Sequence, residues 1–513
     1  MTAAPGTRNP ADGSALDPVA PTPIEEIPEI VRRARAAQPV WAHLPLSERI
    51  EATFAIARRV LERRAEAMVI LSAETGKSEA ECLLSEVAGI MDFAKGAARA
   101  AKKALAPEKI PLSVLDYPGK KVVVEAVARG VVGIIAPWNY PLGNFYKPIF
   151  PALLAGNGVV LKPSEHSPRS GAWLAEVCAE ILPKGLVGVV QGGGEVGTAL
   201  IDHVDALTFT GSVRTGRKVA ARSGERLIPC SVELGGKDAA IVLADCDLGR
   251  TAVGVAMWGM HNAGQNCAAI ERVYVEEAIA DRFVERLGKV AAALHVAPAA
   301  EPTDFGPMQN EMQLRIVEEH VDEARAKGAT VVAGGKRTGR GLGYEPTVLD
   351  RCTEDMRVVR EETFGPVLAV LRVRDAEEAV LRANDSAYGL NGSVWTTDLA
   401  RGAALARRLE VGVALVNNHA FTGILPETPW TGTKDTGPGI ASSRHAYGTF
   451  VRRRTVLVDA GKNPDPWWFP ANEDTYAFGE ALALRALGSL RALLRLAGLF
   501  KKRIAAIRRL GAG

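Results

Sequence analysis

The sequence predicts an α/β fold with a doubly wound, mostly parallel sheet, and three observations support this prediction. Between Val131 and Leu234, short apolar runs alternate with segments long enough for helices, a pattern typical of parallel strands joined by crossover helices. A second pattern of this kind runs from about Gly235 to Asn418. The length of 513 residues, with 47% hydrophobic and 24% charged residues, is typical of a folded globular chain with several cores.

Two elements are expected before the alternating region. From Leu46 to about Lys77, apolar residues recur at helical spacing with Arg and Glu between them, which predicts an amphipathic helix. Two β-rich runs, Ile110–Tyr117 and Lys120–Val127, flank the pair Pro118-Gly119. This arrangement predicts a hairpin over residues 110–130.

The strands of the first alternating region are short apolar runs. They are Val131–Ala136, Gly158–Leu161, Leu186–Val190, Ala206–Phe209 and Leu227–Val232. Such sheets bind ligands at the carboxyl ends of their strands, so the residues after these runs are candidate site residues. In the second region, helices are expected around Arg250–His261, Ile279–Ala293 and Glu311–Lys327.

Cys267 and Glu233 are the first candidates for chemistry. Cys267 ends the run Gly264-Gln265-Asn266-Cys267, and Glu233 begins the run Glu233-Leu234-Gly235-Gly236-Lys237. A cysteine beside small and amide residues is accessible, and the pair offers a thiolate nucleophile and a carboxylate base. A single cysteine is more often a buried structural thiol, so the other motifs have to decide between these interpretations.

Composition excludes several other classes of protein. The six cysteines have no CxxC spacing, which argues against a disulfide framework and against a zinc site. The formal net charge is +3, but residues 481–513 hold eight Lys or Arg and no acid, so the rest carries 54 basic and 59 acidic residues, or −5. Nucleic-acid binding by the body therefore has no support. Residues 1–20 lack the pattern of a secretory signal, and we expect a cytoplasmic protein.

Three further motifs follow predicted strands. Asn139 lies between Pro137 and Pro141, where its amide could stabilise an oxyanion or satisfy a turn. Lys162 and Glu165 follow the next strand and either bind ribose hydroxyls or are solvated. The run Phe209-Thr210-Gly211-Ser212 precedes a predicted helix at Val213–Ala221, whose first amides suit a pyrophosphate, although a plain helix cap would use the same serine.

With the run Glu361-Glu362-Thr363-Phe364-Gly365-Pro366, these motifs occur in the order found in the aldehyde dehydrogenase superfamily, which the chain resembles from about Asn9 to Val458. The resemblance implies a Rossmann-like NAD(P)-binding domain (residues 9–109 and 131–234) and an α/β catalytic domain (235–428). It also implies a β-hairpin oligomerisation extension (110–130 and 445–460), followed by a C-terminal extension (461–513). A homodimer or homotetramer is expected on the same ground.

The resemblance also assigns catalytic roles. The residue matching Cys267 attacks the aldehyde to form a thiohemiacetal, and Asn139 and the cysteine's own N–H stabilise the oxyanion. After hydride transfer, Glu233 activates the water that hydrolyses the thioester to a carboxylic acid. A CoA-acylating branch of the family typically lacks this glutamate, and a non-catalytic binding member would lose one of the three residues. No metal is expected.

For the cofactor, the resemblance implies NAD, with NADP as a further possibility. Trp138, Lys162, Glu165 and Ser212 match positions around the adenosine and pyrophosphate. Glu362 matches the carboxylate that binds the nicotinamide ribose, and Phe364 lies beside the ring. The remaining matched positions are Phe209, Gly211 and Leu234. A carboxylate at Glu165 would repel a 2′-phosphate, which favours NAD.

One segment departs from the family pattern. In the loop Pro429–Gly437, Trp430-Thr431-Gly432 stands where many members have Phe-Gly-Gly, and a threonine stands where they have serine. This loop lies near the substrate entrance in the family, so relatives' substrates do not transfer safely. From Ala481 to Leu510, apolar and basic residues alternate at helical spacing, which predicts one basic amphipathic helix. None of its uncharged stretches approaches the ~20 residues that a helix needs to span a bilayer. It fits either peripheral contact with an anionic membrane through residues 481–510, which would suit medium- or long-chain aliphatic aldehydes, or packing on protein.

Overall fold

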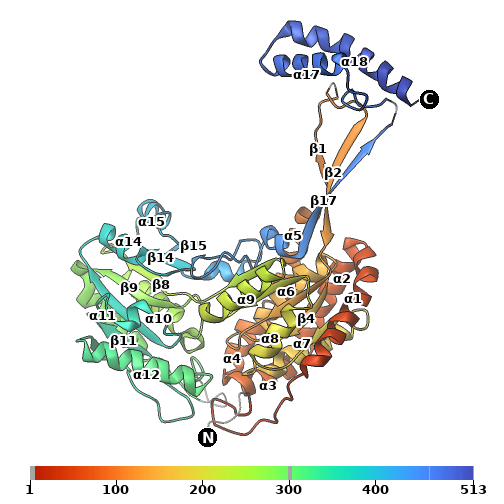
Figure 1. Cartoon of the computed structure of the whole chain (residues 1–513). Helices are drawn as coiled ribbons and strands as arrows, with labels where there is room; N and C mark the ends of the chain where they lie inside the picture. The colour runs from red at the N-terminus through yellow and green to blue at the C-terminus, as the bar shows by residue number, and fades with distance from the viewer. Residues whose placement is uncertain (1–5, 115, 298–302, 462, 512–513) are drawn as a thin grey trace. The chain divides into compact units, whose positions relative to one another are not determined.

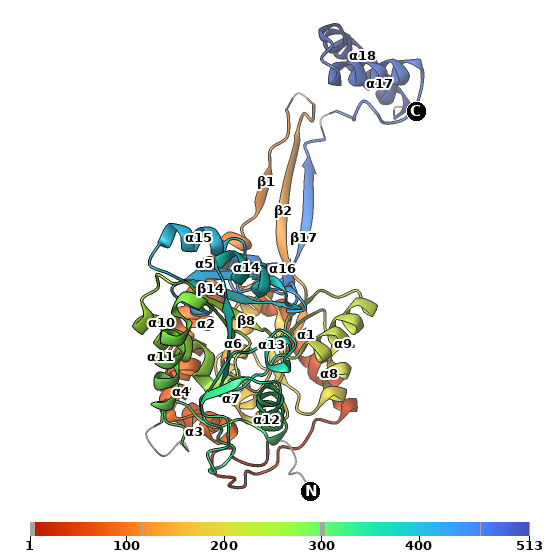
Figure 2. The same cartoon turned by 90° about the vertical axis from the view of Figure 1, so that its left-hand side faces the viewer.

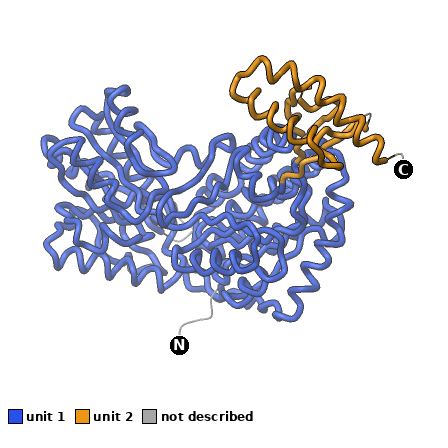
Figure 3. The backbone as a smooth tube through the Cα atoms, turned by 45° about the horizontal axis from the view of Figure 1, so that its top comes forward, with its two compact units in different colours: residues 1–106, 126–452 blue, residues 107–125, 453–513 orange. Residues whose placement is uncertain are grey.

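The computed structural model describes residues 6–114, 116–297, 303–461 and 463–511. The chain divides into two compact units, coloured separately in Figure 3. Unit 1 holds residues 1–106 and 126–452, and unit 2 holds residues 107–125 and 453–513. No helix within the described residues is long and apolar enough to cross a membrane.

Unit 1 contains a five-stranded parallel sheet with the strand order β5-β4-β3-β6-β7. Its strands are β3 (Val131–Ile135), β4 (Gly158–Lys162), β5 (Val187–Val189), β6 (Ala206–Thr210) and β7 (Cys230–Glu233). The chain starts at the central strand, moves outward through β4 and β5, and then returns to the other side. The strand order therefore reverses between β3 and β6, where the following loops diverge and leave a crevice.

Helices cover both faces of this sheet (Figures 1 and 2). The crossover helices are α6 (Gly143–Leu154), α7 (Pro168–Ala179), α8 (Gly194–Ile201) and α9 (Val213–Glu225). The N-terminal elements are η1 (Ile24–Glu26), α1 (Ile27–His43), α2 (Leu46–Glu62), α3 (Arg64–Thr75), α4 (Glu79–Cys82), η2 (Leu83–Val87) and α5 (Ile90–Ala104). The prediction of one helix over residues 46–77 is wrong, because Arg63 leaves the helical region (φ −92°, ψ 21°) and separates α2 from α3.

A seven-stranded sheet forms the second layer of unit 1, with the strand order β10-β11-β12-β9-β8-β14-β15. Only the β10–β11 pair is antiparallel. The strands are β8 (Asp238–Val242), β9 (Ile270–Glu276), β10 (Thr330–Ala333), β11 (Thr347–Asp350), β12 (Val367–Val373), β14 (Asn391–Trp395) and β15 (Val413–Val416). Its central strands are buried along their whole length, as expected for a sheet covered on both faces.

The remaining elements of unit 1 are helices of different lengths and a two-stranded ribbon. The longer helices are α10 (Leu248–Met260), α11 (Ala280–Ala292), α12 (Glu311–Ala326), α14 (Ala376–Asn384) and α15 (Leu399–Ala406). The short elements are η3 (His261–Gly264), η4 (Glu277–Ile279), α13 (Arg357–Arg360), η5 (Phe421–Ile424), η6 (Arg444–Ala446) and α16 (Tyr447–Phe450), with β13 (Tyr388–Gly389) paired to β16 (Thr433–Lys434). The sheets therefore confirm the predicted α/β class.

Unit 2 begins with a three-stranded sheet in the order β1-β2-β17. The strands are β1 (Glu108–Ile110), β2 (Lys120–Ala128) and β17 (Val451–Asp459). The predicted hairpin forms, with Ile110 opposite Val122, but its first strand ends at Ile110 instead of Tyr117. Pro111 provides the reason, because proline has no N–H to donate to the ladder.

The C-terminal segment of unit 2 differs from the predicted single helix. It forms two helices, α17 (Glu473–Ala486) and α18 (Leu490–Leu510), which lie side by side in Figure 1. Gly488 has φ +87°, a left-handed conformation that ends α17, and Ser489 then caps α18 through its hydroxyl. The apolar residues that were predicted to lie along one helix are therefore divided between α17 and α18.

Candidate active site

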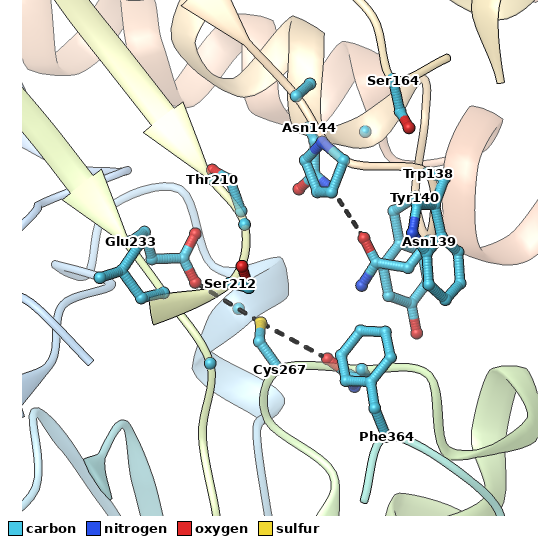
Figure 4. A pocket seen from close by; sticks show the side chains of 18 of the residues that line it. Trp138, Asn139, Tyr140, Asn144, Ser164, Thr210, Ser212, Glu233, Cys267 and Phe364 are labelled. Atoms are coloured by element: carbon cyan, nitrogen blue, oxygen red, sulfur yellow. Dashed lines mark hydrogen bonds between the residues drawn. The ribbon is translucent and has the colours of Figure 1, made fainter. Parts of the chain in front are cut away.

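A cleft of about 1640 Å³ in unit 1 brings the predicted site residues together (Figure 4). It includes the loops after β3, β4 and β6, where the strand order reverses. All twelve candidates line it: Trp138, Asn139, Lys162, Glu165, Phe209, Gly211, Ser212, Glu233, Leu234, Cys267, Glu362 and Phe364. Within the described ranges, no group of three His, Cys, Asp or Glu side chains is placed to hold a metal ion.

Cys267 and Glu233 are in direct contact. The thiol Sγ lies 3.5 Å from Glu233 Oε1 and 3.8 Å from Asn266 Oδ1. Burial raises the pKa of the Cys267 thiol well above its ordinary value, and the nearby Glu233 carboxylate raises this pKa further. The raised pKa favours the neutral thiol, and the side chains of a candidate nucleophile and a candidate base lie in contact here.

Trp430 holds the same carboxylate from the other side. Its indole Nε1–H donates a 2.8 Å hydrogen bond to Glu233 Oε1, the oxygen that also faces Cys267 Sγ. No role was predicted for this side chain. The available signal was the departure at Pro429-Trp430, because a phenylalanine at that position has no N–H to donate.

Two glycines allow the cysteine loop to lie close against neighbouring backbone. A Cβ on Gly236 would lie 2.1 Å from the Cys267 carbonyl oxygen, so only glycine permits this contact between the two motifs. Before the cysteine, Asn262, Ala263 and Gly264 all have φ near +55° to +69°, and a Cβ on Gly264 would meet the Gly365 carbonyl at 2.0 Å. Backbone strain of this kind persists where the surroundings hold it in place.

Asn139 is held by groups that sequence reasoning did not identify. Lys77 Nζ and Asn262 Nδ2 both donate to the Asn139 carbonyl, at 2.6 and 3.0 Å. Lys77 is buried and paired with buried Glu86 at 2.7 Å, and Glu86 also accepts N–H groups at the start of α6. The Asn139 side-chain oxygen accepts from Asn144 Nδ2, so the amide NH₂ points toward the cysteine loop, where it donates to the Gln265 carbonyl.

The opposite part of the cleft contains groups suited to a dinucleotide. Ser212 caps α9, and its hydroxyl accepts from Thr215 N–H at 3.4 Å, so the thirteen-residue helix begins at the cleft wall. Lys162 is buried, lies 3.8 Å from Glu165, and has its pKa lowered by burial. The cap that the sequence allowed for Ser212 therefore forms, and the pyrophosphate site at the same helix end stays a prediction.

Glu362 and Phe364 enter the cleft from a loop fixed by a buried ion pair. Glu271, paired with Lys237, accepts the N–H groups of Thr363 and Phe364 at 2.8 and 2.9 Å. The Glu362 carboxylate accepts from Gly236 N–H at 3.0 Å, and burial raises its pKa to about 8. A Cβ on Gly235 would lie 2.3 Å from Glu362, so this glycine leaves room for the carboxylate.

The residues of the cleft fit a nicotinamide dinucleotide. A helix N-terminus suits the pyrophosphate, a hydrogen-bonding carboxylate at Glu362 suits ribose hydroxyls, and the edge-to-face rings of Trp138 and Phe364, 5.5 Å apart, provide an apolar surface. These groups and the Cys267 thiol line one continuous cleft, so a bound nicotinamide could reach the thiol.

Comparison with known proteins agrees with this geometry. The model of the aldehyde dehydrogenase family matches residues 4–456. A Mycolicibacterium smegmatis protein named "Putative succinate-semialdehyde dehydrogenase, NADP(+)" is 40% identical over 86% of each chain. The 4,4'-diapolycopene aldehyde oxidase of a Methylomonas species is 34% identical over 91% of this chain and 88% of its own. The crystal structure of a Mycobacterium tuberculosis aldehyde dehydrogenase complexed with NAD+ is 35% identical, with a TM-score of 0.84 over 89% of this chain and 95% of that chain. The chain therefore belongs to the aldehyde dehydrogenase family, whose members oxidise aldehydes.

Proposed function

We propose that this protein oxidises an aldehyde with an apolar chain to its carboxylic acid through a thioester on Cys267. The observation that carries the proposal is the 3.5 Å contact between Cys267 Sγ and Glu233 Oε1 in a cleft that also contains Asn139 and the cofactor-binding candidates. A nucleophile, a base and an oxyanion donor around one cavity are the parts that covalent oxidation of an aldehyde requires.

In the first half of the reaction, the Cys267 thiol loses its proton to solvent, and the thiolate Sγ bonds to the aldehyde carbon. The carbonyl electron pair moves to the oxygen, where the Asn139 amide and the Cys267 backbone N–H stabilise the charge. When bound in the cleft beside Trp138, Glu362 and Phe364, NAD(P) would supply the acceptor for the hydride that leaves this carbon. The carbonyl re-forms, and Cys267 then carries a thioester.

In the second half, Glu233 takes a proton from a water molecule that attacks the thioester carbon. The C–S bond breaks, Cys267 leaves as a thiolate that takes this proton back from Glu233, and the carboxylic acid departs. Each cycle therefore consumes one aldehyde, one water and one NAD(P), and yields one acid, one reduced cofactor and one proton. The placement of Glu233 beside the thiol favours hydrolysis over acyl transfer to CoA, and its presence with Cys267 and Asn139 argues against a non-catalytic role.

The cofactor we propose is NAD, with NADP also accepted. Glu165 near the adenosine end would repel a 2′-phosphate, whereas Lys218, Arg214 and Arg222 line the same cleft and offer positive charge. Relative rates of NADH and NADPH formation distinguish these contributions.

The mouth of the cleft supports an apolar substrate. Leu84 of η2, Val253 and Met257 of α10, and Ile424 of η5 line the cleft and are all exposed. Exposed apolar side chains around one opening mark a surface for an apolar ligand, and medium- or long-chain aliphatic aldehydes fit this surface.

A second candidate is an aldehyde that also carries a carboxylate. Lys147 lines the cleft that contains Cys267, so its ammonium could pair with such a carboxylate. The name of the Mycolicibacterium relative points in the same direction.

Initial rates over a panel of aliphatic aldehydes of increasing chain length and succinate semialdehyde, with NAD and with NADP, test these proposals. Cys267→Ala should abolish turnover, while Cys246→Ala, which changes a half-buried thiol outside the cleft, should not. Turnover retained by Cys267→Ala would contradict the mechanism. A preference for succinate semialdehyde that is lost in Lys147→Met would replace the apolar substrate by the charged one.

We also propose self-association into a homodimer or homotetramer. β17 is an edge strand of the unit 2 sheet, and Val456, Leu457 and Val458 on it are exposed. An edge of this kind pairs readily with another strand. Light scattering measures the mass, and Leu457→Lys should shift it toward the monomer.

A further inference from the structure

The two C-terminal helices have a small core of their own. Phe478 and Ala481 of α17 pack with Leu496 of α18, and Leu499 and Phe500 join them. Part of the apolar stripe therefore packs on the chain itself, as one of the two sequence interpretations expected. This contact buries only some of the apolar side chains of α17 and α18. Many leucines near the turn between the helices are exposed to solvent.

Buried Arg503 fixes the far end of this helix pair. Its guanidinium donates to the carbonyls of Pro466, Trp468 and Pro470 and to Asn472 Oδ1, so the chain before α17 is bound to α18. Arg503 is fully buried, and four accepting oxygens compensate its charge. The helix pair is thus an ordered element with two distinct ends.

The other end is a cluster of exposed leucines, here called the leucine tip. It comprises Leu482, Leu484, Leu487, Leu490, Leu493 and Leu494, which surround the turn at Gly488. Leu487, Leu490 and Leu494 are 84%, 77% and 79% exposed. Six exposed leucines lie within thirteen residues of sequence. An exposed apolar patch of this kind marks a site of interaction with another molecule or a membrane.

The charge along α18 indicates which partner binds the leucine tip. Beyond Glu480, the chain to residue 513 contains eight basic residues and no acid. Arg491, Lys501, Lys502, Arg508 and Arg509 of α18 are exposed. A second copy of the chain would bring identical basic surfaces together, whereas an anionic lipid surface offers opposite charge to the cations and an apolar interior to the leucines.

We propose that the leucine tip and the basic residues of α18 bind the surface of an anionic membrane, with the leucines inserted among the lipids at the interface. Since no described helix is both long and apolar enough to cross, we place this contact at the membrane surface. This inference does not rest on the proposed substrate, because it concerns unit 2 alone.

The test is cosedimentation of the full chain with vesicles of phosphatidylcholine alone and of phosphatidylcholine mixed with phosphatidylglycerol. We expect binding to the mixed vesicles, much less binding to phosphatidylcholine, and several-fold weaker binding at high salt. Leu487→Ser/Leu494→Ser should weaken binding by about tenfold or more, because burial of two leucines is lost. Leu381→Ser/Leu399→Ser, which changes two exposed leucines of unit 1, is the matched control and should bind like the unmodified chain.

Oxidation rates of a water-soluble aldehyde should be equal in all variants, which separates loss of membrane binding from misfolding. Three results would overturn the proposal: no binding to mixed vesicles at low salt, equal binding to both vesicle types, or unchanged binding by the tip variant. If binding is absent and the tip variant instead lowers the mass measured by light scattering, a second copy covers the leucines.

Discussion

Replacement of Trp430 by phenylalanine tests whether the indole N–H positions the proposed base. The substitution keeps an aromatic ring in the cleft wall but removes the 2.8 Å hydrogen bond to Glu233 Oε1. A hydrogen bond to a charged group contributes about 1.5–3 kcal/mol. If all of this free energy holds the carboxylate in place for hydrolysis, thioester breakdown slows by roughly 10- to 150-fold, at about 1.4 kcal/mol per factor of ten.

Stopped-flow measurement of NADH formation separates the two halves of the reaction. In Trp430→Phe we expect a rapid burst that approaches one NADH per site, followed by a slow steady state, because thioester formation does not require the indole N–H. The matched control is Trp258→Phe, since Trp258 also lines the cleft but donates its N–H to Asn418 Oδ1. This control should keep the steady-state rate.

Two results would refute the reasoning about Trp430. An unchanged steady-state rate would mean that Glu233 needs no support from the indole. A burst rate that falls in proportion to the steady state would mean that Trp430 shapes the aldehyde site instead of holding the base.

Three further predictions concern groups around the same cleft. Glu233→Gln removes the carboxylate that raises the pKa of the Cys267 thiol, so alkylation by iodoacetamide at neutral pH should become several-fold faster; a slower reaction would mean that the carboxylate mainly accepts the thiol proton. Because the pKa of Glu362 is raised to about 8, this group is mostly protonated at neutral pH, and if ribose hydroxyls bind its charged form, NAD binding should release a proton and tighten as the pH rises through 8. Calorimetry of Cys267→Ala in buffers of different ionisation enthalpy measures that proton, and Glu362→Gln should release none. Lys77→Met leaves Glu86 buried and unpaired, and should lower the free energy of unfolding by about 3–5 kcal/mol in urea titrations, with partial recovery in Lys77→Met/Glu86→Gln; equal stability of all three proteins would contradict a structural role for the pair.

The α/β class and the location of the cleft could be predicted from local pattern. Short apolar runs separated by helical segments leave few alternatives to a parallel sheet, and the residues after β3 and β6 lie at the point where its order reverses. Element ends were less predictable. The break at Arg63, the early end of β1 at Ile110 and the break between α17 and α18 each depend on one or two residues. Pro111 and Gly488 were visible signals for the last two, whereas Arg63 gave none.

The sequence by itself determined which residue types are available for chemistry, because motifs such as Glu233–Lys237 and Gly264–Cys267 are contiguous in the chain. Tertiary structure decided which groups hold them. Lys77, Asn262 and Trp430 lie far along the chain from the residues they contact, and a hydrogen bond between distant segments leaves no periodic trace in sequence. The same holds for the C-terminal segment, where packing of α17 on α18 selected which apolar residues are buried and which form the leucine tip.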